Sequence, residues 1–335
     1  QAVIVNSGNA NTCNADGPYI AETMCKLTAS ALGIEDNDVI VASTGVIGQP
    51  LPIEPFETGI PMAKESLNYN GSKDAAEGIM TTDTKLKEIS LSFDIGGKEV
   101  KIGGIAKGSG MIHPNMATML CFITTDCMIK KELLQKALSD IVKDTFNMIS
   151  VDGDTSTNDS VLLMANGMAE NNLIVEEDDN YAKFYEALYY IMEELSKKIA
   201  GDGEGCTCLF EVKVLNALSD EDARCMAKSV VTSSLTKAAV YGHDANWGRI
   251  LCAMGYSGAE FDPEKVDIYF ESKAGKLQIV KDGRATDYSE EKATEILSEE
   301  HVIAICDCKQ GDFKATAYGC DLTHEYVNIN ADYRS

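Results

Sequence analysis

The sequence predicts an α/β protein in which mixed sheets are layered with helices. Short apolar runs rich in β-branched residues alternate with longer stretches whose apolar residues recur at helical spacing. Glycines punctuate both kinds of segment. The chain has 335 residues, 44% of them hydrophobic, so it can bury a sizeable core in one large or two moderate domains.

The first half of the chain shows this alternation clearly. In order, we expect strand Ala2–Val5, helix Ile20–Leu32, strand Val39–Ala42, the hairpin strands Ile89–Phe93 and Val100–Ile102, and the buried strands Thr118–Thr125 and Val161–Ala165. The first helix is predicted to stop at Gly33, because glycine commonly ends helices. Gly96 and Gly97 supply the turn chemistry of the hairpin.

The second half continues with helices and then strands. We expect helices Tyr181–Ala200, Asp220–Ser233 and Asp244–Met254, followed by strands Val266–Phe270, Val302–Cys306 and Phe313–Tyr318. Asp244 is predicted to cap its helix and Trp247 to pack in the core. An acidic stretch at Asn166–Asp179 suggests a soft structural boundary.

The charge balance restricts the classes of partner. Acidic residues outnumber basic ones 53 to 29, and the formal net charge of −24 would repel nucleic-acid phosphates and anionic lipids. Small-molecule or protein partners are therefore favoured.

Cysteine usage and the lack of apolar targeting segments predict the cellular location of the protein. Eleven cysteines without the spacing of a disulfide scaffold indicate reduced thiols. The absence of an apolar run long enough for a membrane span, or of a cleavable leader, predicts a cytoplasmic protein. Because the first residue is Gln1 and an apolar run starts at once, we expect an upstream segment to be missing.

The most unusual segment runs from Gly103 to Leu120, with glycines at one end and a predicted strand at the other. It fails as a phosphate-binding loop, because Lys107 is followed by glycine rather than by Ser or Thr. Thr118 stands where the loop meets the strand, and its hydroxyl could attack the preceding carbonyl. From spacing alone, however, Thr118 is better interpreted as a β-branched residue that opens a strand.

If the Ala117–Thr118 bond were cut through an ester, Thr118 would become a chain terminus. Its α-amine would then lie close to its own hydroxyl. An α-amino group has a pKa of about 7.7–8.0, so a useful fraction is neutral near physiological pH and can accept the hydroxyl proton. One residue would then supply both nucleophile and base.

Six segments in order along the whole chain resemble the ornithine acetyltransferase family. They are Ala2–Asn11, Ser43–Gly48, Lys107–Leu120, Asp202–Gly205, Asp244–Arg249 and Val327–Ser335. The resemblance implies a self-cleaving N-terminal-threonine acyltransferase fold. It implies cleavage between Ala117 and Thr118, giving an α chain, residues 1–117, and a β chain, residues 118–335, with two of each in the assembly.

The resemblance also implies roles for individual residues. Thr118 would be the nucleophile, and Thr44 and Gly45, at a turn after the strand Val39–Ala42, would form the oxyanion hole. The residues implied in substrate binding are Thr81, Lys107, Thr118, Glu204, Asn330 and Ser335. From charge matching, we expect Lys107 to hold the substrate carboxylate and Glu204 the distal ammonium, both from open glycine-rich loops.

Two features depart from the family pattern. Family members carry a further N-terminal stretch, and relatives usually show Gly-Ala-Thr-Lys after the glutamate, where this chain has Gly205, Cys206, Thr207 and Cys208. The missing lysine puts fine substrate contacts in doubt.

Metal binding is not expected from the cysteine and histidine positions. The pairs Cys206/Cys208 and Cys306/Cys308 are too close for a usual zinc site, and strand alternation would turn the two side chains of a pair to opposite faces. The histidines have no ligand or triad spacing. His113 is nearest the predicted cut and could assist it.

The function implied is transfer of acetyl from N-acetylornithine to glutamate through an acetyl-Thr118 enzyme, in arginine biosynthesis. Such a shuttle needs no cofactor and predicts ping-pong kinetics. Some family members also accept acetyl-CoA as donor, and the sequence does not separate the two types. The alternatives are an aminopeptidase or amidase hydrolase with the same nucleophile, a non-catalytic small-molecule-binding relative, and a relative that serves another amino-acid acceptor in secondary metabolism.

Overall fold

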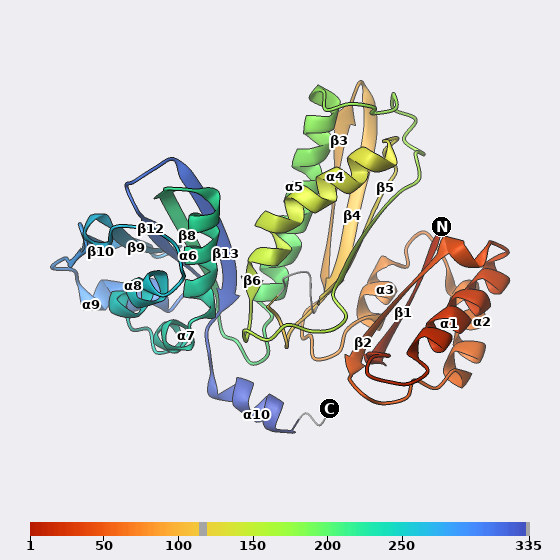
Figure 1. Ribbon diagram of the computed structural model, residues 1–335, viewed down its shortest axis with the longest axis horizontal. Coiled ribbons are helices and arrows are strands. Elements are labelled where there is room, and N and C mark those ends of the chain that lie inside the picture. The colour runs from red at the N-terminus through yellow and green to blue at the C-terminus, as the bar shows by residue number, and fades with distance from the viewer. Residues whose placement is uncertain (114–118, 333–335) are drawn as a thin grey trace.

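The computed structural model describes residues 1–113 and 119–332 and contains three sheets with helices packed against them (Figure 1). The predicted α/β class is confirmed. None of the helices in the described ranges combines the length and apolar character that a membrane crossing requires.

The N-terminal part is a parallel pair of strands, β1 (Ala2–Asn9) and β2 (Val39–Val46), with α1 (Gly17–Leu32), α2 (Glu54–Ser66) and α3 (Ser72–Gly78). Both strands run four residues further than the apolar pattern predicted, because backbone pairing continues through polar positions. The first helix starts three residues early, since a proline is well placed in its first turn, and it ends as predicted at Gly33, whose φ is +72°.

The middle sheet has the order β3-β4-β5-β7. Its strands are β3 (Lys87–Ile95), β4 (Lys98–Lys107), β5 (Leu120–Thr125) and β7 (Ser160–Ala165). The predicted hairpin is confirmed: β3 and β4 are antiparallel around Gly96 and Gly97, both with positive φ. Lys107 at the end of β4 lies opposite Leu120 at the start of β5, so the ends of the intervening segment are neighbours.

One face of this sheet is covered by α5 (Asp179–Ala200), with α4 (Lys131–Ile141) against it (Figure 1). The side chain of Asp178 accepts hydrogen bonds from the backbone N–H groups of Asn180 and Tyr181 in the first turn of α5, which fixes the start of the helix. The soft boundary expected near residues 166–179 falls in the connection between β7 and α5. Residues on both sides of that connection pack into one hydrophobic cluster.

The C-terminal part is a seven-stranded sheet of order β11-β10-β9-β12-β8-β13-β6. Its strands are β6 (Ile149–Ser150), β8 (Leu209–Ala217), β9 (Asp267–Ser272), β10 (Gly275–Lys281), β11 (Arg284–Ala285), β12 (His301–Asp307) and β13 (Phe313–Cys320). The helices of this part are α6 (Asp220–Thr232), α7 (Ser234–Tyr241), α8 (Trp247–Gly255) and α9 (Glu290–Leu297). The pairing of β6 with β13 joins this sheet to the middle of the molecule.

The helix expected from Asp244 begins later. Its cap is Asn246, whose side chain accepts from the Arg249 N–H, while Asp244 accepts from the Asn246 side chain. Trp247 packs against the C-terminal core, as predicted. After β13 the chain leaves the sheet and forms α10 (His324–Asp332), which lies below the middle part in Figure 1.

Candidate active site

The candidate site lies where β4 ends and a loop after α5 comes alongside it. The Glu204 N–H donates to the Ser109 carbonyl at 3.0 Å, and the Ser109 hydroxyl donates to the Asp202 carbonyl at 2.7 Å. Ser109 itself is fully buried. The two glycine-rich segments that were singled out in the sequence, 94 positions apart at Ser109 and Gly203, are therefore held side by side.

Lys107 is buried, with 4% of its surface exposed, so the expectation of an open loop position was wrong. Lys107 is the last residue of β4, and the side chains of Ile112, Ile199 and Met119 pack around the neighbouring Gly108. Its ammonium donates to the Thr81 hydroxyl at 2.8 Å and lies 3.7 Å from Asp83. Burial lowers the pKa of Lys107, against the raising effects of Asp83, Asp159 and Glu204.

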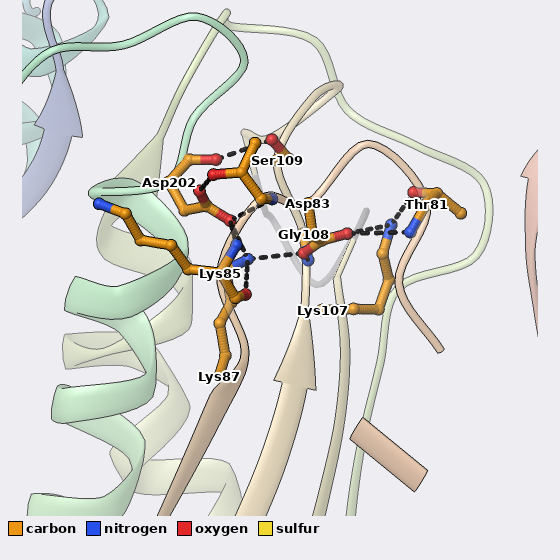
Figure 2. A network of polar contacts seen from close by, with 9 residues as sticks. Thr81, Asp83, Lys85, Lys87, Lys107, Gly108, Ser109 and Asp202 are labelled. Carbon is orange, nitrogen blue, oxygen red and sulfur yellow. Dashed lines mark hydrogen bonds and ion pairs between the residues drawn. The ribbon is translucent and has the colours of Figure 1, made fainter. Parts of the chain in front are cut away.

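A buried network of opposite charges positions this lysine, and Figure 2 shows its members converging from three segments. Lys87 donates to Asp83 at 2.6 Å and to Asp202 at 2.5 Å. Asp83 also accepts from the Gly108 N–H at 2.7 Å, directly after Lys107. Burial acts to raise the pKa of Asp83, but Lys107, Lys87 and the Gly108 N–H outweigh it and hold the pKa below its usual value.

Sequence reasoning missed this network. Its only local signal is the four-residue spacing of Asp83 and Lys87 in a run of polar residues, which is more typical of a solvated surface. Asp202 approaches only through the fold, and it also accepts from the backbone N–H groups of Thr84 and Lys85.

Glu204 is also buried, with 8% of its surface exposed, which corrects the prediction of an open loop. Its carboxylate lies directly against Gly110, where a β-carbon would collide with it. The Asn330 amide on α10 donates to the carboxylate at 2.8 Å. The C-terminal helix therefore completes the surroundings of Glu204. Ser335 lies outside the described residues.

Thr44 and Gly45 do not lie at a turn after a strand, as predicted, but inside β2. The backbone of Gly8 on β1 approaches Gly45 so closely that no β-carbon fits, and Gly45 has a φ of +127°. Asn9 faces both Thr44 and Val46, which marks a bulge there. Side chains alternate along a strand, so Thr44 shares a face with Ala42, which packs in one cluster with Leu120 of β5.

His113 points its Nδ1 toward the Ser150 hydroxyl at 3.0 Å. Burial, together with the nearby charge of Lys228, lowers the pKa of His113 to about 4. Ala117 and Thr118, the predicted cleavage pair, lie outside the described residues. Met119 is described and is buried.

The cysteine pairs do not follow simple strand alternation. Cys206 and Cys208 precede β8 rather than lying in it, and Cys308 follows β12. Cys306 and Cys308 enter the same hydrophobic cluster, so the expectation of opposite faces was wrong for this pair. Within residues 1–113 and 119–332, no group of three or more His, Cys, Asp or Glu side chains is arranged to hold a metal ion.

Comparison with known proteins identifies close relatives. The family model described as ArgJ family matches residues 1–335. The arginine biosynthesis bifunctional protein ArgJ of Caldanaerobacter subterraneus subsp. tengcongensis is 52% identical over 100% of this chain and 83% of its own length. The glutamate N-acetyltransferase of Methanocaldococcus jannaschii is 47% identical over 99% of this chain and 84% of its own length.

A solved structure is also similar. The crystal structure of arginine biosynthesis bifunctional protein ArgJ from Bacillus halodurans matches with a TM-score of 0.61 and 48% sequence identity. The match covers 98% of the solved chain but 63% of this one.

Proposed function

Because this chain belongs to the ArgJ family, we propose that it is an acetyltransferase of arginine biosynthesis that carries acetyl from N2-acetylornithine to glutamate on Thr118. The family resemblance read from the sequence is confirmed by the match over residues 1–335. Relatives named as bifunctional arginine biosynthesis proteins and as a glutamate N-acetyltransferase support this reaction.

The observation that carries the proposal is the placement of a buried cation and a buried anion beside the segment that holds Thr118. Lys107 ends the strand before that segment, and Leu120 opposite it begins the strand after. The Glu204 backbone N–H donates to the carbonyl of Ser109 in the same segment, and the charge of Glu204 acts to raise the pKa of Lys107. Acetylornithine offers a carboxylate and a distal ammonium, which such a pair of charges can recognise.

In this scheme Lys107 and Thr81 bind the substrate carboxylate, while Glu204 binds the ammonium with help from Asn330 and Ser335. A lysine ammonium has three N–H donors, so it can keep its bond to Thr81 while it binds a ligand. Thr44 and Gly45 stabilise the oxyanion that forms when the acetyl carbonyl is attacked. The backbone of Gly8 lies in close contact with Gly45 and so holds the Gly45 backbone in place before substrate binds.

Self-cleavage between Ala117 and Thr118 prepares the nucleophile. The products are an α chain, residues 1–117, and a β chain, residues 118–335, which assemble with two copies of each. The solved relative supports this division, because nearly all of that chain matches only 63% of this one. A product starting at Thr118 has about this proportion of the 335 residues.

The transfer then has two halves. The free α-amine of Thr118 takes the hydroxyl proton, and the oxygen attacks the acetyl carbonyl carbon. The bond from that carbon to nitrogen then breaks, the α-amine passes its proton to the departing nitrogen, and ornithine leaves. Glutamate next attacks the acetyl-enzyme and leaves as N-acetylglutamate. The threonine oxygen carries the acetyl group, so the reaction needs no metal or organic cofactor, and acetyl-CoA can serve only as an alternative donor.

A donor-exchange assay tests this function. The processed enzyme is incubated with N-acetylornithine and labelled ornithine in the absence of glutamate, and label is followed into N-acetylornithine. Ping-pong transfer predicts exchange without glutamate and conversion to N-acetylglutamate when it is added. Release of acetate at a rate independent of glutamate would instead identify a hydrolase, and no turnover of either kind would identify a binding protein.

A further inference from the structure

Asp152, in the loop after β6, carries a carboxylate that binds the backbone of a different segment. Its Oδ2 accepts from the Met111 N–H at 2.6 Å, and its Oδ1 accepts from the Ile112 N–H at 2.9 Å. Met111 has a φ of +55°, a conformation that an L residue adopts only at a cost in free energy. Asp152 therefore stabilises a turn that the backbone alone would not favour.

This turn contacts Glu204. Gly110 directly precedes Met111, and a β-carbon on Gly110 would lie 2.3 Å from the carboxylate carbon of Glu204. The Gly110 backbone is thus in close contact with that carboxylate. Because Asp152 bonds to the next two N–H groups of the chain, it fixes the position of this backbone.

The Asp152 carboxylate also reaches α10. The Tyr326 hydroxyl donates to its Oδ2 at 3.4 Å. The Asn330 amide, about one helical turn later, donates to the Tyr326 carbonyl at 3.0 Å and to the Glu204 carboxylate at 2.8 Å. A bond that fixes Tyr326 therefore also fixes where Asn330 lies. Asp152 is bonded to both elements that contact Glu204.

The helix α10 depends on polar contacts of this kind. None of its residues, 324–332, is buried, so apolar packing holds it only weakly. Directly before the helix, the Thr323 hydroxyl donates to the Gly205 carbonyl at 2.7 Å and accepts from the Tyr326 N–H at 3.2 Å. A helix docked in this way should respond measurably to the loss of one bond.

We propose that Asp152 is a positioning residue for Glu204. It holds the Gly110 backbone directly, and α10 through Tyr326, in the arrangement in which Glu204 and Asn330 receive the distal ammonium of acetylornithine. This inference rests on the proposed function, because that function supplies the substrate. The hold of Asp152 on α10 does not depend on it.

A merely structural role for Asp152 predicts different kinetics. Partial unfolding would reduce the amount of active enzyme and lower the apparent kcat, but the molecules that stay folded would keep their KM. Loss of positioning instead weakens the binding of acetylornithine and raises its KM. It leaves kcat unchanged, and also the KM for glutamate, which has no distal ammonium.

Three substitutions separate these roles. Asp152→Asn puts an N–H donor in place of one acceptor oxygen, so bonds to the turn or to α10 are lost. Tyr326→Phe removes only the hydroxyl and leaves Asp152 and the turn as they are. Asp154→Asn is the matched control, because Asp154 is exposed and bonds to Asp152 through its backbone N–H, which the substitution keeps while it removes an equal charge.

Hydrogen exchange of the full-length protein measures the hold on α10. The backbone amides of residues 324–332 are followed by mass spectrometry in the wild type and the three variants. We expect exchange about 10-fold faster in Asp152→Asn and in Tyr326→Phe, the scale of one lost bond to a charged group, and the wild-type rate in Asp154→Asn.

Steady-state kinetics, with each substrate varied in turn, measure the effect on Glu204. The KM for acetylornithine should rise by up to about 10-fold in Asp152→Asn and Tyr326→Phe, because the Asn330 bond is weakened, with kcat and the KM for glutamate unchanged. If Tyr326 acts through Asn330, Tyr326→Phe should have no further effect on this KM in an Asn330→Ala background.

The outcomes distinguish this inference from the proposed function. A wild type that does not turn over acetylornithine would defeat the proposed function and the substrate role of Asp152 with it, whereas exchange alone judges the hold on α10. Wild-type exchange in both Asp152→Asn and Tyr326→Phe would overturn the inference. So would faster exchange with an unchanged KM for acetylornithine. If Asp152→Asn does not fold or is not cut, Tyr326→Phe decides by the same two measurements.

Discussion

The Asn330 side chain on the last helix donates a 2.8 Å hydrogen bond to the carboxylate of Glu204, 126 positions earlier in the chain. Tyr326 of the same helix lies against Gly205, the next residue after Glu204. The C-terminal segment is thus part of the surroundings of a buried anion. Glu204 and Asn330 both belong to the set of residues that the family resemblance implied in substrate binding.

Replacing Glu204 by Gln should weaken the binding of acetylornithine but not that of glutamate. The amide keeps the shape of the side chain but loses the charge that pairs with the distal ammonium. A hydrogen bond to a charged group contributes about 1.5–3 kcal/mol, so the KM for acetylornithine should rise about 10- to 100-fold. Glutamate has no distal ammonium, and its KM should not rise. Steady-state kinetics with each substrate varied in turn measure both, and an unchanged KM for acetylornithine would remove Glu204 from this role.

The contribution of the helix itself is tested at Asn330. Asn330→Ala removes the donor to Glu204 and should raise the KM for acetylornithine by about 10-fold. Asn328→Ala is the matched control, because the Asn328 side chain on the same helix donates to the exposed Glu325. Equal effects of the two substitutions would mean that the helix, rather than the Asn330 bond, matters.

The Lys87 network should dominate the stability of the site. Lys87→Met leaves two buried carboxylates, Asp83 and Asp202, without their shared cation, which should lower the free energy of unfolding by about 3–5 kcal/mol. Lys73→Met, which breaks an exposed pair with Glu77, should cost less than about 1 kcal/mol. Urea unfolding of both variants provides the comparison, and similar costs would show that burial does not strengthen the network.

The pH dependence of stability reports on Asp159. Its folded pKa of about 8 lies above the value of about 4 for an unfolded chain, so the folded protein binds more protons between these limits. The stabilising contribution of the carboxyl is complete below about pH 4 and is lost as the pH rises toward 8.

Thr118→Ala should therefore lose stability relative to Thr118→Ala/Asp159→Asn over that range, by at most about 1.4 kcal/mol per pH unit. The Thr118→Ala background keeps both chains uncut. Parallel stability curves of the two proteins from pH 4 to 8 would show that Asp159 titrates normally.

The sequence predicted local features of the fold better than it predicted the burial of the site residues. Hairpin glycines and the glycine after α1 act through backbone conformation, which neighbours in sequence determine, and both were confirmed. Lys107 and Glu204 were expected in open loops because glycines surround them. Ile199 packs beside Gly108, next to Lys107, and Asn330 of α10 bonds to Glu204, and both reach the site only through tertiary packing.

The same reason explains the groups that were missed. The partners of Lys87 are Asp83, four positions away, and Asp202, more than a hundred positions away, so no window of sequence contains the network. Asp159, directly before β7, lines one cavity with Met119, directly before β5, because those two strands pair in parallel. By contrast, the motif around Thr118 was recognised from sequence alone.

The most direct test of the account is intact-mass spectrometry of the full-length wild-type protein and Thr118→Ala, each with and without N-acetylornithine. The account predicts two fragments from the wild type, the second beginning at Thr118 and gaining one acetyl group with the donor, and losing it again when glutamate is added. Thr118→Ala should remain a single chain with no acetyl group. A wild-type protein that stays in one piece, or a fragment that never gains the acetyl group, would contradict the account.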